Sequence, residues 1–93
     1  MLIDALRDEA WQVRNGAAEG VARFGPDAKE AVPVLIERLD ELFCMREALA
    51  ALGRIGPDAK PAVPAIREIL LRKNPWTDRR TALFALQNIE REL

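Results

Sequence analysis

The chain has 93 residues, of which 49% are hydrophobic and 31% are charged. This length allows one domain, and the composition is typical of a folded helical protein rather than a disordered one. The formal net charge of −1, from 14 basic and 15 acidic residues, gives no overall attraction to nucleic acid or to anionic membranes.

The sequence also carries features that bear on location. No apolar run approaches the roughly 18 residues that a membrane span needs. The N-terminus, Met1-Leu2-Ile3-Asp4, lacks the basic and long apolar regions of a secretory signal peptide. The single cysteine, Cys44, cannot form an internal disulfide, which fits a reducing compartment. We therefore predict a cytoplasmic protein with no membrane partner.

The chain opens with a short helical segment, residues 2–8, which is too short to be stable alone. Its pattern matches residues 35–41, the later half of a helix further along the chain. We therefore interpret residues 1–9 as part of a repeat.

Residues 11–24 predict the first full helix, because apolar residues recur mostly three or four positions apart. The expected buried stripe is Trp11, Val13, Ala17, Ala18, Val21 and Phe24. Gly25-Pro26 ends the helix, since glycine accepts left-handed backbone and proline cannot continue the hydrogen-bond ladder. Gly16 and Gly20 either allow a neighbouring helix to approach closely or are simply tolerated.

A second helix follows the Gly25-Pro26 turn. Asp27 is the expected N-cap, and Glu30 completes a variant of the capping box. Pro33 predicts a short turn over residues 28–31 and then a kink or restart of the helix. The expected inward side chains are Val32, Leu35, Ile36 and Leu39, with the helix ending near Glu41.

The same pair of helices recurs in residues 42–73. Its first helix turns inward Phe43 or Cys44, together with Ala48, Ala51, Leu52 and Ile55, and stops at Gly56-Pro57. Its second helix opens at Asp58 and buries Val63, Ile66, Ile69 and Leu70. A further first helix begins after Asn74-Pro75, with a stripe of Trp76, Ala82, Leu83, Leu86 and Ile89.

A tandem repeat underlies this pattern. Residues 17–39 and 48–70 are identical at twelve of 23 positions when shifted by 31, and Gly-Pro-Asp-Ala-Lys occurs in both copies. We divide the chain into a partial repeat 1–9, repeats 10–41 and 42–73, and a half repeat 74–93. These units predict an all-α solenoid of stacked antiparallel helix pairs, with about five helices plus a partial N-terminal helix.

Three motifs carry a resemblance to a known family. They are Trp11-Gln12-Val13-Arg14, Ala17-Ala18-Glu19, and Ile55-Gly56-Pro57-Asp58-Ala59-Lys60 followed by Ala62-Val63-Pro64. Together they resemble the short bacterial HEAT-like repeats that are grouped with phycobilisome lyase HEAT-like proteins. The resemblance covers almost the whole chain, and it implies that the second helices line a concave side where partners bind. Tetratricopeptide and ankyrin repeats fit worse, because tyrosine and the Thr-Pro-Leu-His signature are absent.

The side chains offer little for catalysis. Histidine and serine are absent, and the hydroxyl side chains are Thr77 and Thr81. The usual general base, most zinc sites and the Ser-His and Cys-His mechanisms are therefore excluded. We predict no catalytic residue, no cofactor and no metal. Cys44 is interpreted as a small buried hydrophobe, with a reactive thiol as the alternative.

The solvent face of the second helices is the predicted partner-binding surface. Once the buried stripes are removed, this face comprises Val34, Glu37, Arg38, Glu41, Ala65, Glu68 and Arg72. Trp76 joins them as a possible aromatic anchor, because tryptophan is enriched at interface hot spots. The alternative for Trp76, and for the equivalent Trp11, is packing against the preceding turn.

These observations predict a non-catalytic protein–protein interaction scaffold. One alternative, implied by the resemblance, is an accessory subunit of a bilin lyase-type or other modifying enzyme. Nucleic-acid binding ranks below both, since acidic residues neighbour nearly all the arginines and favour solvated ion pairs. Contact with another chain, or with further repeats of a longer protein, is also expected through Leu2, Leu6 and Val13 at one end or Leu83, Leu86 and Ile89 at the other.

Overall fold

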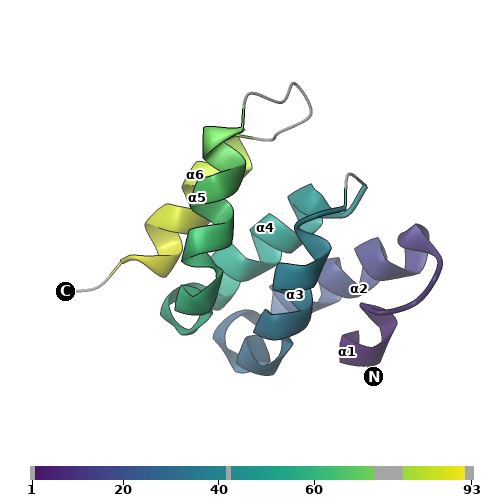
Figure 1. The fold of residues 1–93 in the computed structure, drawn as a ribbon. Coiled ribbons are helices and arrows are strands. Elements are labelled where there is room, and N and C mark those ends of the chain that lie inside the picture. Colours follow the sequence, from purple (N-terminus) through teal and green to yellow (C-terminus); the bar gives the residue numbers. More distant parts are fainter. Residues whose placement is uncertain (1, 42, 73–78, 92–93) are drawn as a thin grey trace.

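The computed structural model describes residues 2–41, 43–72 and 79–91 (Figure 1). These residues contain helices and turns but no β-strand, which confirms the all-α solenoid. The elements in chain order are α1 (Leu2–Ala5), α2 (Trp11–Phe24), the 3₁₀ helix η1 (Gly25–Ala31), α3 (Val32–Arg38), α4 (Met45–Ile55), the 3₁₀ helix η2 (Gly56–Ala62), α5 (Val63–Leu71) and α6 (Arg79–Ile89). None of the helices in these ranges has the length and apolarity that crossing a bilayer requires.

The helices form two layers (Figure 1). The first helices of the repeats, α2, α4 and α6, make one layer, in which α4 lies between the other two and packs on both. The second helices, α3 and α5, make the other layer, and each packs against a first helix. The short α1 contacts α2 at the N-terminal end of the stack.

The central helix α4 carries much of the core. Its buried residues are Ala48, Leu49, Ala51, Leu52, Gly53 and Ile55. Each large aliphatic side chain hidden in this way contributes about 1.5–3 kcal/mol. The predicted stripe omitted Leu49, because a stripe describes one buried face whereas α4 is covered on two sides.

The helices on either side of α4 are covered less than predicted. In α2, Trp11 and Val13 are each 42% exposed and Phe24 is 60% exposed, so half of the expected stripe faces outward. Leu83 of α6 is likewise exposed. Each of these helices packs against one first helix rather than two. Conversely, Leu6 and Ile89, expected at uncovered ends, are fully buried within the chain.

Glycine ends both long first helices where the backbone requires it. Gly25 and Gly56 have φ values of 60° and 83°, in the left-handed region that other residues rarely adopt. A 3₁₀ helix begins at each glycine, so Asp27 lies inside the first turn of η1 rather than at an N-cap, and no side chain caps this turn. The predicted capping box is therefore wrong. The restart near Pro33 is confirmed, since α3 begins at Val32 with that proline in its first turn.

The close approach between first helices occurs at Gly53, not at Gly16. A Cβ atom added to Gly53 would lie 2.9 Å from Cε2 of Phe84 and 3.0 Å from Cα of Ala85. A Cβ atom added to Gly16 would have nothing within 4 Å. The absence of a side chain at position 53 thus lets α6 pack directly on α4.

These two glycines provide a matched test of the packing. We expect Gly53→Ala to lower the free energy of unfolding by about 1–2 kcal/mol, because the backbone at Ala85 must move. Gly16→Ala should raise it by about 0.5–1 kcal/mol, because alanine is the better helix former and meets no obstacle. Urea unfolding followed by circular dichroism measures both. A Gly53→Ala variant as stable as Gly16→Ala would contradict the close approach.

Candidate functional site

A cleft of about 260 Å³ lies between the second helices α3 and α5. Its lining residues are Ile36, Leu39, Asp40, Ala65, Glu68, Ile69 and Arg72. The apolar members form the floor, in which Leu39 and Ile69 are buried whereas Ile36 and Ala65 are partly exposed. The three charged members are exposed around it. The cleft therefore offers apolar contact inside a charged rim.

The rim contains one carboxylate, Asp40, that no cation among the described residues neutralises. Glu68 accepts a 2.7 Å hydrogen bond from Nη2 of Arg72, one helical turn away. Asp40, by contrast, makes no ion pair with any described residue. Because an exposed pair such as Glu68–Arg72 is worth only about 0.3–0.5 kcal/mol, a partner can rearrange it at little cost.

The predicted partner-binding residues divide into separate groups. Ala65, Glu68 and Arg72 line the cleft. Glu37 is exposed but does not line it, and its carboxylate lies 3.6 Å from Arg38. Trp76 lies outside the described residues. The remaining lining residues were not predicted to bind a partner. Ile36, Leu39 and Ile69 were expected in the buried stripes. Asp40 was not among the predicted partner-binding residues, although it lies one helical turn from Ile36.

Val34 was expected on the solvent face, but it is only 3% exposed. Val34 and Arg38 are four residues apart and so lie on the same face of α3. Arg38 Nη1 donates a hydrogen bond of 3.2 Å to the carbonyl oxygen of Leu6. The N-terminal segment therefore covers the side of α3 that the sequence pattern assigned to solvent.

Arg38 and Glu41 take part in an ion-pair network within the chain. Nη1 of Arg38 lies 3.6 Å from Oε2 of Glu41, and Nε of Arg14 lies 2.9 Å from Oε1 of the same carboxylate. The Arg14 contact is close in distance, but neither atom forms a hydrogen bond of good geometry. Glu41 thus links α2 to the end of α3, so these two predicted partner-binding residues are largely engaged in holding the repeat together.

A comparison with known protein families identifies the repeats. A family model for HEAT repeats matches residues 1–87. The chain belongs to the HEAT-repeat family. No curated protein matches it in a sequence search. The family assignment confirms the HEAT-like resemblance, whereas the phycobilisome lyase class is a finer assignment that stays a prediction.

Arg14 also joins the first HEAT repeat to the turn before it. Its Nη1 atom donates hydrogen bonds of 2.7 Å and 3.0 Å to the carbonyl oxygens of Asp8 and Glu9. Together with Glu41, these contacts place one guanidinium between the N-terminal segment and the end of the first repeat. Arg14 is therefore a structural connector within the chain.

Cys44 lies beside this network and is buried. Burial raises the pKa of its thiol above the usual value, while a hydrogen bond with Arg14 opposes the rise. The same hydrogen bond is the main cause of a raised pKa for Arg14. The thiol is therefore protonated at neutral pH, which supports the interpretation of Cys44 as a small buried hydrophobe.

Trp11 packs across the repeat boundary. Its ring stacks on Phe43 with the centroids 5.2 Å apart and an interplanar angle of 24°. Both rings remain exposed, and Nδ2 of Asn15 donates a hydrogen bond of 2.9 Å to the carbonyl oxygen of Phe43. This aromatic pair helps to fix the start of the second HEAT repeat against the first.

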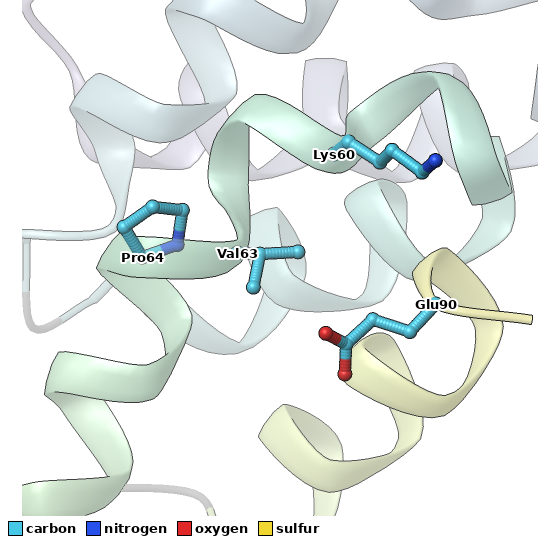
Figure 2. Close-up of a pocket in the computed structure, with 4 residues that line it drawn as sticks. All are labelled: Lys60, Val63, Pro64 and Glu90. Carbon is cyan, nitrogen blue, oxygen red and sulfur yellow. The ribbon is translucent and has the colours of Figure 1, made fainter.

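Figure 2 shows another hollow, of about 460 Å³, where η2 and α5 meet the end of α6. Lys60, Val63, Pro64 and Glu90 line it, with the carboxylate of Glu90 extending from α6 toward α5. That carboxylate accepts a 2.6 Å hydrogen bond from Arg67, and Lys60 also has a polar interaction. Because its charged groups are engaged within the chain, this hollow is a weaker candidate than the cleft.

The described part of the chain contains no group of three or more histidine, cysteine, aspartate or glutamate residues placed to hold a metal ion. The lining residues of the α3–α5 cleft likewise include no nucleophile paired with a base. The chemistry available in the cleft is therefore apolar contact and ion pairing, which are the elements of protein recognition.

The role of Arg38 can be separated from that of its neighbour Glu37. We expect Arg38→Ala to lower the free energy of unfolding by about 1–2 kcal/mol, because the Leu6 carbonyl loses its charged donor. Glu37→Ala, at an exposed position, should change it by less than about 0.5 kcal/mol. Thermal or urea unfolding measures the difference. Equal stability of the two variants would contradict the structural role of Arg38 and would make it available for binding a partner.

Proposed function

We propose that this HEAT-repeat chain is a non-catalytic protein–protein interaction scaffold whose docking surface is the α3–α5 cleft. HEAT repeats commonly serve as protein-interaction scaffolds. The observation that carries the proposal is the cleft itself, an apolar floor between two second helices with exposed charges around it. Interfaces typically combine such an apolar centre with a polar rim.

The arrangement of the helices favours docking with little reorganisation. α3 packs on α4, and α5 packs on α6, so the first-helix layer holds both walls of the cleft. A partner side chain that enters would contact Ile36 and Ala65, which are the partly exposed members of the floor. Because the walls are already in place, binding avoids the entropic cost of ordering them.

The other functions predicted from the sequence receive less support. The acidic rim residues Asp40 and Glu68 would repel a phosphate backbone, which counts against nucleic acid in this cleft. No observation favours the role of a pigment-attachment accessory subunit over that of a scaffold. We also propose a cytoplasmic location, which rests on the presence of a single cysteine, Cys44, that cannot form an internal disulfide.

Self-association has one observation in its favour. A hollow of about 360 Å³ lies at the N-terminal end of the stack, lined by Ile3, Val21, Phe24, Asp27, Ala28, Glu30 and Ala31. Phe24 is exposed there, whereas Ile55, its equivalent 31 residues later, is fully buried. Light scattering after size exclusion tests this second proposal: a monomer at every concentration would contradict it.

The scaffold proposal is tested by blocking the cleft. A binding protein is first isolated by affinity purification and mass spectrometry, and its affinity is then measured with the purified proteins by calorimetry. We expect Ala65→Arg to weaken binding by at least about 10-fold, because a long charged side chain fills the space above the apolar floor. The control Ala10→Arg introduces the same side chain at an exposed position before α2 that does not line the cleft.

Circular dichroism and the melting temperature verify that both variants remain folded. Retention of the affinity in Ala10→Arg and its loss in Ala65→Arg would support the cleft as the docking surface. Equal affinities of the two variants would contradict the proposal, as would the failure of any protein to bind saturably.

A further inference from the structure

A separate hollow of about 510 Å³ lies on the first-helix side of the molecule, where α4 and α6 end. Its lining residues are Pro26, Gly53, Arg54, Ile55, Gly56, Pro57, Phe84, Asn88 and Arg91. The hollow shares no lining residue with the α3–α5 cleft. We call it the arginine hollow, after Arg54 and Arg91.

The arginine hollow is cationic. Arg54 and Arg91 are exposed and line it, and none of the described residues that line it is an aspartate or a glutamate. Neither guanidinium forms an ion pair or a side-chain hydrogen bond with any described residue. By contrast, Arg14, Arg38, Arg67, Arg72 and Arg79 all donate hydrogen bonds within the chain.

The remaining lining residues provide apolar contact. Phe84 is exposed beside Gly53, whose missing side chain leaves the ring edge close to the backbone of α4. Pro26 and Pro57, from the equivalent turns of the two repeats, are also exposed. An aromatic ring and two prolines next to two guanidinium groups that have no described partner form a surface that suits a ligand with both anionic and apolar parts.

The preference for basic residues at the C-terminal ends of helices does not by itself explain the two arginines of the hollow. Arg54 lies in the last turn of α4, where a cation interacts favourably with the helix dipole. Arg23 occupies the equivalent last turn of α2 and is exposed too, yet it does not line this hollow. The dipole explains one basic residue at each helix end. It does not explain two of them around one hollow with an exposed phenylalanine.

We propose that the arginine hollow binds an acidic segment of a partner protein, with carboxylates next to an aromatic or aliphatic side chain. Guanidinium groups bind carboxylates with paired, charge-assisted hydrogen bonds. The apolar side chain of the segment would lie against Phe84 and the prolines. This surface is distinct from the α3–α5 cleft in both position and charge, so the chain would contact its partners on two sides.

The charges around the hollow favour a short acidic segment over nucleic acid. Asp27 and Asp58 directly follow the two prolines and are exposed, although they do not line the hollow. A continuous phosphate backbone would pass these carboxylates, whereas a peptide can present its charge to Arg54 and Arg91 alone. The net charge of −1 gives no compensating attraction to nucleic acid.

Calorimetric titration of the full chain with a synthetic peptide tests the proposal. The probe is a short peptide of glutamates around one tryptophan, and its control has glutamine in place of every glutamate. We expect saturable binding of the acidic peptide that weakens at high salt. The double variant Arg54→Gln with Arg91→Gln should weaken it by at least about 10-fold, since both charge-assisted contacts are lost.

Two variants control for general charge effects. Arg23→Gln removes an equally exposed arginine from the same place in the first repeat, and Asp40→Asn alters the α3–α5 cleft. Both should bind the acidic peptide within about twofold of the unaltered chain, as expected for changes at distant independent sites. Unchanged binding in Asp40→Asn also keeps this test independent of the scaffold proposal.

Several results would overturn the proposal. They are the absence of saturable binding, equal binding of the glutamine peptide, and equal affinities of Arg23→Gln and the double variant. Displacement of the peptide by an equal concentration of inorganic phosphate would assign the hollow to a free anion instead. Tighter binding of a duplex DNA oligonucleotide, lost in the double variant, would assign it to nucleic acid.

Discussion

The rest of the structure depends on the burial of α4 between α2 and α6. Six of its eleven residues are buried, and Leu49, Leu52 and Ile55 are completely hidden from solvent. In a stacked-repeat protein, stability is approximately a sum over neighbouring units, so the unit with two neighbours contributes most. α4 also determines where α3 and η2 lie, because both pack against it. The geometry of both proposed binding surfaces therefore follows from this one helix.

The two surfaces differ in charge because of how the chain uses its arginines. Arg14 and Arg38 interact with Glu41 and with backbone carbonyls, and thereby link the N-terminal segment to the first repeat. Arg72 is paired with Glu68, which leaves Asp40 as the charge of the α3–α5 cleft that has no ion pair among the described residues. Arg54 and Arg91 have no such partners among the described residues. The α3–α5 cleft is consequently acidic around an apolar floor, and the arginine hollow is basic.

The sequence was sufficient to predict the all-α repeat fold, because a doubled Gly-Pro-Asp-Ala-Lys turn and helical periodicity are local signals. Periodicity shows which residues share a face of a helix, but not how many faces have neighbours. For this reason Leu49 was omitted from the core, while Phe24 and Val13 were wrongly included in it. Val34 was missed because it is buried on the face of α3 where Arg38 bonds to Leu6, a residue 32 positions away in the sequence.

The cleft was predicted only in part, because periodicity does not show how neighbouring helices pack. Ala65, Glu68 and Arg72 follow from subtracting the buried stripe, whereas Asp40 depends on how far apart α3 and α5 lie. The arginine hollow could not be predicted, since it joins residues from both repeats and from the end of α6. Its shape also depends on the approach of Phe84 to Gly53, a contact over 31 residues of sequence that no local pattern reveals.

Hydrogen exchange of the free chain, measured by mass spectrometry or NMR, tests most directly whether α4 is the centre of stability. The structure predicts that the hydrogen-bonded amides in the later turns of α4 exchange slowest, at rates set by global unfolding. The amides of α1, a four-residue helix at the end of the stack, should exchange fastest among the helices. Exchange in α4 as fast as in α1, or faster than in both α2 and α6, would contradict the account.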